Sequence, residues 1–171
     1  MWSSSVKTGS ELSIAGITAK QLAKDFGTPT FFIDEADFRA RAMAWNDALK
    51  EAFGDKAGTV YYASKAFSCT EVARWIKDLG IGIDVSTGGE MAVALAGGID
   101  PKKIEVHGNN KSIAEIEKAI SVGVETIVID SMYEIDRVAT AAAKAGKVQR
   151  VLLRLTPGIE AHTHESIATA H

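Results

Sequence analysis

The sequence contains one cysteine, three prolines and no long hydrophobic run among its 171 residues. Cys69 has no second cysteine to pair with, so an internal disulfide is excluded and a reducing compartment is expected. No apolar stretch approaches the roughly 18 residues that a membrane-spanning helix needs. Residues 1–9 lack the apolar core of a secretory signal. These absences together predict a cytoplasmic protein without a membrane partner.

The chain also lacks a strong excess of either charge. It has 19 Lys and Arg against 22 Asp and Glu, which gives a formal net charge of −3. A protein without a basic excess is not expected to bind nucleic acid through charge. The hydrophobic fraction of 46% and the charged fraction of 24% are ordinary for a globular domain with its own core.

Short β-rich apolar segments alternate with amphipathic helical segments along most of the chain. The spacing of about 21 to 24 residues between strand starts fits one strand, one helix and two short loops. The apolar runs are continuous rather than alternating, which is typical of parallel strands covered on both faces. The predicted strands are residues 59–63, 80–85, 103–107, 126–130 and 150–154.

The helices between these strands are marked by their first residues. Four Ser/Thr-x-x-Glu sequences follow predicted strands, and this pattern is typical of a capping box at a helix N-terminus. They begin at Ser68, Thr87, Ser112 and Ser131. Glycines then stand where the helices should end, as is common at the position after a helix.

The first part of the chain follows a different pattern. We expect a short helix at residues 18–26, a strand at residues 30–33 and a long helix at residues 35–53 that is capped by Asp34. After Arg154 the repeating pattern stops.

Two α/β architectures are compatible with five consecutive βα units. One is an open doubly wound sheet, which five strands can complete. The other is a TIM (β/α)8 barrel, which needs eight strands and about 250 residues. In the second case this chain is expected to be only a part of a longer polypeptide.

Polar side chains follow all five predicted strands. In a barrel, reactive residues lie at the C-terminal ends of the strands, and here these ends carry Lys65, Asp84, His107, Asp130 and Arg154. Lys65 is of special interest, because a lysine amine at a water-poor site can act as a Schiff-base nucleophile. The alternative is an ordinary surface lysine whose stem packs on the protein.

Four segments, taken in order, resemble a known family. Residues 62–66 (YASKA) resemble the cofactor-lysine motif of the fold-type III pyridoxal-phosphate (PLP) decarboxylases. Three others resemble the bacterial diaminopimelate decarboxylases: residues 27–29 (GTP), 107–111 (HGNNK) and 156–165 (TPGIEAHTHE). The resemblance extends from about residue 16 to residue 171.

The resemblance implies a fold, a domain division and a reaction. Residues 35–171 would form the first part of a PLP-binding (β/α)8 barrel, and residues 1–34 would contribute a strand to a second, β-rich domain. The complete protein would be a homodimer that decarboxylates an amino-acid substrate, meso-2,6-diaminopimelate, to L-lysine. This chain would carry the lysine half of the site and would be inactive alone.

The resemblance also assigns roles to single residues. Lys65 would bind PLP as a Schiff base and take part in catalysis, and Asp84, Arg154 and His107 would contact the cofactor. Each of the last three has a plainer alternative: Asp84 as a helix cap, Arg154 in an ion pair at the barrel end, and His107 as a core histidine. We expect no metal site at His162, His164 or His171, because a His-x-His pair on a tail lacks a full ligand set.

Two other functions stay open from the sequence alone. One is a PLP-binding barrel of the alanine racemase or PLP-homeostasis type, which shares the lysine but lacks the HGNNK and TPGIEAHTHE segments. The other is a non-catalytic, truncated fragment.

Overall fold

The structure is a computed structural model, and it describes residues 5–158. The chain divides into two compact units, residues 1–60 and residues 61–171. The domain boundary that the sequence analysis placed between residues 34 and 35 differs from this division into compact units and stays a prediction.

The N-terminal unit begins with three short antiparallel strands that the sequence analysis missed. They are β1 (Ser5–Thr8), β2 (Glu11–Ile14) and β3 (Ile17–Thr18), paired in that order. Helix α1 (Ala19–Phe26) follows directly, and the Thr18 hydroxyl caps it by accepting a hydrogen bond from the Gln21 N–H at 3.1 Å. The helix predicted at residues 18–26 is therefore confirmed.

The strand predicted at residues 30–33 is wrong. These residues follow a cis Thr28–Pro29 peptide bond and lie outside any strand. The Phe31 side chain is 99% exposed. A β-prone segment forms a strand only when another strand pairs with it and its side chains are packed, and within residues 5–60 nothing pairs with this segment.

The long helix α2 (Glu35–Phe53) has the bounds that the sequence predicted. The Asp34 carboxylate caps it by accepting hydrogen bonds from the N–H groups of Ala36 at 2.9 Å and Asp37 at 3.3 Å. A short 3-10 turn, η1 (Gly54–Lys56), follows the helix.

The C-terminal unit is an α/β fold built on a five-stranded parallel sheet. Its strands pair in sequence order, each with the strand before it. A doubly wound sheet would reverse its strand order at a switch point, so this order excludes that architecture and supports a partial (β/α)8 barrel. The strands are β4 (Tyr61–Ala63), β5 (Gly82–Val85), β6 (Ile104–Val106), β7 (Thr126–Ile129) and β8 (Val151–Leu153).

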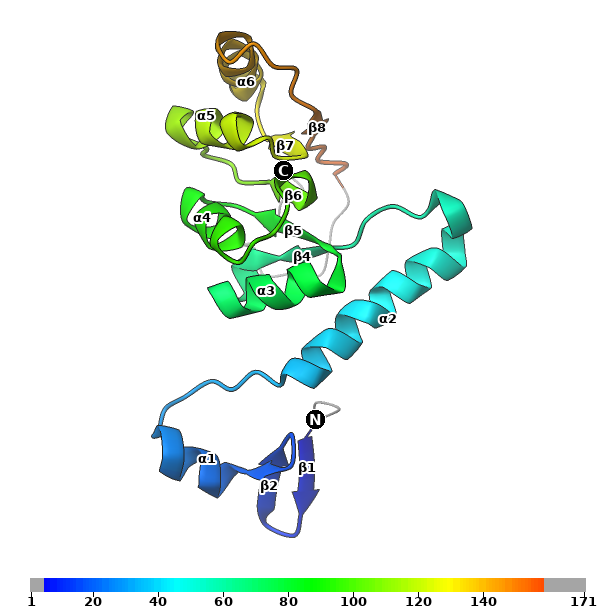
Figure 1. The fold of residues 1–171 in the computed structure, drawn as a ribbon, viewed down its shortest axis with the longest axis vertical. Helices are drawn as coiled ribbons and strands as arrows, with labels where there is room; N and C mark the ends of the chain where they lie inside the picture. The colour runs from blue at the N-terminus through cyan, green and yellow to red at the C-terminus, as the bar shows by residue number, and fades with distance from the viewer. Residues whose placement is uncertain (1–4, 159–171) are drawn as a thin grey trace. The chain divides into compact units, whose positions relative to one another are not determined.

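Four helices lie on the same side of this sheet, as Figure 1 shows. This one-sided cover is the arrangement of a barrel wall, whose other face points to the barrel interior. The helices are α3 (Thr70–Leu79), α4 (Gly88–Ala96), α5 (Ile113–Val122) and α6 (Met132–Lys144). Two 3-10 turns, η2 (Ser64–Ala66) and η3 (Pro101–Lys103), complete the unit.

The strand register divides the sheet residues between two faces. Paired residues of neighbouring parallel strands point to the same side. Ile83 pairs with Ile104, and both side chains, like that of Ile127, are buried among the helices at 1% exposure or less. Asp84 pairs with Glu105 on the opposite face. The helix-facing side is therefore apolar, and the interior side carries charged residues.

Only one of the four predicted capping boxes is complete. Ser112 exchanges both hydrogen bonds with Glu115 at the start of α5. Thr87 caps α4, but the Glu90 carboxylate accepts from Ser86 rather than from Thr87. Ser131 begins α6 without a side-chain cap. The box predicted at residue 68 is wrong, because α3 has Cys69 at its N-cap position.

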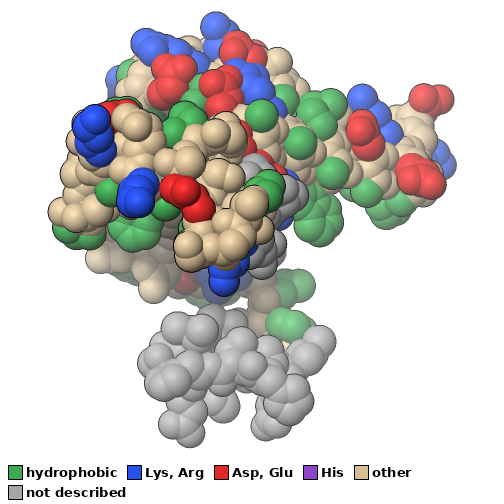
Figure 2. Space-filling view, turned by 90° about the horizontal axis from the view of Figure 1, so that it is seen from below, with side chains coloured by type: hydrophobic (Ala, Val, Ile, Leu, Met, Phe, Trp, Pro, Cys, Tyr) green, Lys and Arg blue, Asp and Glu red, His purple; other side chains and the backbone are tan. Residues whose placement is uncertain are grey.

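Figure 2 shows one face of the molecule, on which acidic and basic side chains are interspersed with hydrophobic ones. Among the described residues, no helix is both long enough and apolar enough to cross a membrane.

Candidate active site at the C-terminal ends of the strands

Lys65 lies at the C-terminal end of β4, in the 3-10 turn η2. The Tyr62 hydroxyl spans this turn and donates a hydrogen bond to the Phe67 carbonyl at 2.8 Å. The Lys65 side chain is exposed, whereas the sequence analysis expected a water-poor enclosure. Lys65 follows β4, which is an edge strand of the five-stranded sheet and pairs with β5 alone among the described strands.

Asp84 and His107 come together at the ends of β5 and β6. The Nε2 atom of His107 lies 3.8 Å from Oδ2 of Asp84 and 2.7 Å from Oε1 of Glu105. The backbone holds His107 in this position, because its N–H donates to the Val85 carbonyl at 2.7 Å. One imidazole thus lies beside two carboxylates on the interior face of the sheet.

The charges around Asp84 act on its carboxyl in opposite directions. Burial raises the pKa of Asp84 above its ordinary value, and this desolvation is the largest effect. The positive charges of His107 and Lys65 lower the same pKa, and the carboxylates of Glu105 and Glu90 raise it. The charge of Lys65 therefore acts on the Asp84 carboxyl across the ends of β4 and β5.

Arg154 belongs to a different pair. Its guanidinium donates to the Asp130 carboxylate at 3.2 Å, and the backbone N–H of Arg154 donates to the Ile129 carbonyl at 3.0 Å. The ion pair that the sequence analysis kept as an alternative for Arg154 is therefore present at the ends of β7 and β8. Of the four predicted site residues, the structure brings Asp84 and His107 together, places Lys65 at the end of the neighbouring strand β4, and pairs Arg154 with Asp130.

Glu105 is a residue that the sequence analysis missed. It lies two positions before His107, and residues two apart on a strand point to the same face. Its side chain is 15% exposed. The alternation of Glu105 and His107 within an otherwise apolar strand was the available signal.

A second group of polar side chains lies at the opposite, N-terminal ends of the strands. The Arg150 guanidinium donates to the Glu125 carboxylate at 2.7 Å. The Tyr61 ring lies against Gly82, where an added Cβ would meet ring atoms at 2.5 Å. Burial and the carboxylates of Glu105 and Glu125 raise the pKa of the Tyr61 hydroxyl.

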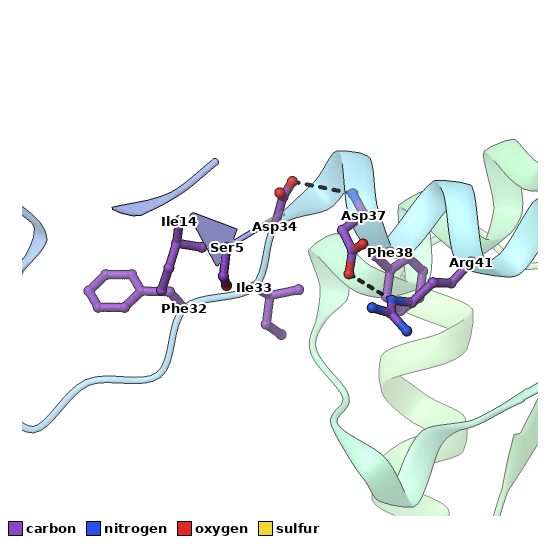
Figure 3. Close-up of a pocket in the computed structure, with 8 residues that line it drawn as sticks. All are labelled: Ser5, Ile14, Phe32, Ile33, Asp34, Asp37, Phe38 and Arg41. Atoms are coloured by element: carbon purple, nitrogen blue, oxygen red, sulfur yellow. Dashed lines mark hydrogen bonds and ion pairs between the residues drawn. The ribbon is translucent and has the colours of Figure 1, made fainter. Parts of the chain in front are cut away.

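Figure 3 shows a pocket that belongs to the N-terminal unit and contains none of the predicted site residues. Its polar wall is built around the start of α2, where the Asp37 carboxylate accepts from Arg41 at 2.7 Å. The lining residues are Ser5, Ile14, Phe32, Ile33, Asp34, Asp37, Phe38 and Arg41. Within residues 5–158, no three His, Cys, Asp or Glu side chains are placed to hold a metal ion, and His162, His164 and His171 lie outside the described residues.

A family model described as "Pyridoxal-dependent decarboxylase, pyridoxal binding domain" matches residues 35–171. The chain belongs to the pyridoxal-dependent decarboxylases. The cofactor of this family is pyridoxal phosphate.

Curated relatives of this chain carry a more specific name. It is 55% identical over 92% of its length to a diaminopimelate decarboxylase of Mycobacterium tuberculosis, and 42% identical over 94% of its length to one of Corynebacterium efficiens. In both cases the match covers 34% of the relative. The chain thus spans about a third of the length of these relatives.

Solved structures of the family have the same fold. The diaminopimelate decarboxylase of M. jannaschii in complex with L-lysine superimposes with a TM-score of 0.82 at 27% identity, over 97% of this chain and 39% of that one. The Helicobacter pylori diaminopimelate decarboxylase complexed with L-lysine gives a TM-score of 0.71 at 28% identity, over 86% of this chain and 37% of that one.

The residues at the strand ends of this decarboxylase chain fit the family cofactor. PLP has an aldehyde that condenses with a primary amine, and Lys65 offers such an amine at the barrel end of β4. The neighbouring Ser64 hydroxyl is buried, and its Oγ atom has no hydrogen-bond partner among the described residues. A buried polar atom without a partner is rare in native proteins, so this position can accept a polar group of a ligand.

Proposed function

We propose that this chain is the lysine-bearing part of a PLP-dependent diaminopimelate decarboxylase, which converts meso-2,6-diaminopimelate to L-lysine and CO₂. The names of the relatives support the reaction, and the L-lysine in the M. jannaschii structure supports the product. Because the chain spans about a third of these relatives, the reaction is proposed for the complete protein.

One observation carries the assignment of Lys65. Lys65 stands at the C-terminal end of the first strand of a barrel wall, two residues after Ala63, which pairs with Asp84 on the next strand. In an (β/α)8 barrel this end of the sheet holds the active site. We therefore assign Lys65 as the residue that holds PLP and Asp84 and His107 as residues that contact it.

When bound, PLP would supply an electron sink for the electron pair that remains at the substrate Cα once the carboxylate has left as CO₂. The chain's own residues hold charge and protons around that group. The contact between His107 Nε2 and Glu105 Oε1 requires a proton on one of the two atoms, so this pair holds a proton at the interior face. Asp84 offers a carboxylate on the strand next to Lys65, and the charge of Lys65 lowers the pKa of that carboxyl.

Four further assignments belong to the same proposal. Arg154 would contact the cofactor from the end of β8, in addition to its pair with Asp130. Residues 35–171 would belong to the barrel domain, which the span of the family model supports, and residues 1–34 to a second domain. The complete protein would be a cytoplasmic homodimer.

Reductive trapping tests the assignment of Lys65. The chain is incubated with increasing PLP, reduced with borohydride, digested and analysed by mass spectrometry. We expect the peptide that contains Lys65 to be labelled at the lowest PLP concentration. Lys144 is a matched control, because it is an exposed lysine on the outer surface of α6. Equal labelling of Lys65 and Lys144 at every concentration would contradict the assignment.

An activity assay tests the second part of the proposal. We expect the complete protein to release CO₂ from meso-diaminopimelate and the Lys65→Ala variant to release none. We expect the 171-residue chain to release none even with added PLP, because it carries only part of the site. Turnover by this chain above that of its own Lys65→Ala variant would refute the last expectation.

A further inference from the structure

A buried ion pair joins two neighbouring loops at the C-terminal end of the sheet. The Nζ atom of Lys111 lies 3.0 Å from Oε2 of Glu134, and the two side chains are only 2% and 4% exposed. Lys111 lies in the loop between β6 and α5, and Glu134 lies in the first turn of α6. Burying two charges is costly, and replacing such a pair by apolar side chains is often neutral for stability. The pair therefore calls for an explanation other than stability.

The hydrogen bonds around this pair connect the backbones of both loops. Lys111 Nζ also donates to the Gly108 carbonyl within its own loop. Glu134 Oε2 also accepts from the Asp130 N–H at 3.0 Å, at the end of β7. One carboxylate oxygen thus holds the β6–α5 loop through Lys111 and the β7–α6 loop through Asp130.

The loop that Lys111 holds is also packed against the preceding loop. Gly108 has a φ of +102°, and an added Cβ would lie 2.8 Å from the Ser86 carbonyl oxygen. The backbone therefore approaches the β5–α4 loop as closely as only glycine allows. Three successive loops are fixed to one another at the end of the barrel wall where the proposed site lies.

We infer that the Lys111–Glu134 pair is a positioning device that fixes the β6–α5 and β7–α6 loops relative to each other. The residues at the starts of these loops are His107 and Asp130, which contact Asp84 and Arg154 respectively. By holding both loops, the pair keeps these two contacts in a fixed spatial relation. What the positioned residues do chemically rests on the proposed function, but their placement does not.

Hydrogen exchange of the complete protein without cofactor tests this inference. The variants are Lys111→Met, Glu134→Gln and the double variant, in which the Gln oxygen can still accept from the Asp130 N–H. We expect backbone exchange to become about tenfold faster in peptides from residues 107–112 and 130–134, and to stay unchanged in α3 and α4.

The chain provides a matched control. Lys144 and Glu117 form an ion pair at 2.8 Å that also links α6 to α5, but their side chains are 73% and 42% exposed. Lys144→Met should leave exchange in both loops as in the wild type, because an exposed pair contributes little.

Three outcomes would overturn the inference. Exchange in the two loops could stay as in the wild type in all variants. It could rise evenly over the four helices, which would mean that the pair supports the sheet as a whole. All three variants, including the uncharged double variant, could unfold, which would also mean that the pair supports the sheet as a whole.

A kinetic readout connects the pair to the proposed site. We expect the double variant to lower kcat for CO₂ release from meso-diaminopimelate by about tenfold, while Lys144→Met retains the wild-type kcat. Unchanged kcat together with faster loop exchange would overturn the positioning role. If the complete wild-type protein releases no CO₂, the proposed function fails, and the exchange experiment still decides whether the pair fixes the loops.

Discussion

The imidazole of His107 is in contact with the carboxylate of Glu105, with 2.7 Å between Nε2 and Oε1. Glu105 lies in β6 and His107 directly follows this strand, and both side chains point to the interior face of the sheet. This contact fixes the ring next to Asp84, which lies on the neighbouring strand. The charges of His107 and Glu105 therefore act on the Asp84 carboxyl from the neighbouring strand, the first lowering and the second raising its pKa.

The pKa of Asp84 should respond to its neighbours with opposite signs. Because the charge of Glu105 raises this pKa, Glu105→Gln should lower it. Because the positive charges of His107 and Lys65 lower it, His107→Ala and Lys65→Met should raise it, the first more than the second. The titration is followed through the carboxyl carbon of Asp84 by NMR. A rise of the Asp84 pKa in Glu105→Gln would contradict this arrangement.

Two helix starts that look alike in sequence should differ in their contribution to stability. Ser112 caps α5 through its side chain, whereas Ser131 at the start of α6 makes no such hydrogen bond. Ser112→Ala should lower the free energy of unfolding by about 1 kcal/mol, and Ser131→Ala should lower it by clearly less. Urea denaturation measures both. Equal losses would show that the cap geometry does not govern stability here.

Glu115 should make the protein sensitive to acid. Hydrogen bonds from the Ser112 N–H and hydroxyl, and then from the Gly88 N–H, lower the pKa of Glu115. A carboxyl whose pKa is lower in the folded state stabilises the fold above its unfolded pKa of about 4.3, and this stabilisation is lost as the pH falls through the folded pKa. Glu115→Gln should remove that part of the acid dependence.

The measurement for Glu115 is the free energy of unfolding as a function of pH. Glu117→Gln is the control, because Glu117 lies on the same helix and its carboxylate pairs with the exposed Lys144. An acid limb that is equally steep in wild type and Glu115→Gln would argue against a lowered pKa at this position.

Gly82 should not tolerate a side chain. An added Cβ would lie 2.5 Å from the Tyr61 ring and 3.1 Å from the Lys103 carbonyl oxygen. Gly82→Ala should therefore lower the free energy of unfolding by about 1–3 kcal/mol through overpacking. Gly58→Ala is the control, because nothing lies within 4 Å of a Cβ there. Urea denaturation of both variants decides the matter, and an equally small effect at the two sites would refute the close packing of Tyr61.

The parts of the fold that were predictable are those with local signals. Asp34 at the N-cap and Gly54 at the C-cap mark both ends of α2, and its bounds were predicted correctly. The five strands of the C-terminal unit were found because each is a continuous apolar run at a regular spacing. The Lys111–Glu134 pair could not be predicted, because it joins residues from two loops that only the folded sheet brings together.

The errors have physical reasons of the same kind. Residues 30–33 have strand-forming side chains, but strand formation depends on a pairing partner that the sequence does not reveal. The hairpin of β1 and β2 was missed because its strands are only four residues long and partly polar, although Gly9 with a φ of +61° marks the turn. In the site, Glu105 was missed because it lies inside β6 and not at the end of the strand, where reactive residues of a barrel are expected.

The pairing of each strand of the C-terminal unit with its immediate predecessor has a consequence for how the polypeptide is made. Every βα unit finds its docking surface in chain that has already left the ribosome, so the sheet can grow in the direction of synthesis. Contacts between neighbours in sequence also carry a small loop-closure cost, which favours fast folding. Lys65, on the first strand of the sheet, would thus be in place before the later units of the barrel wall are translated.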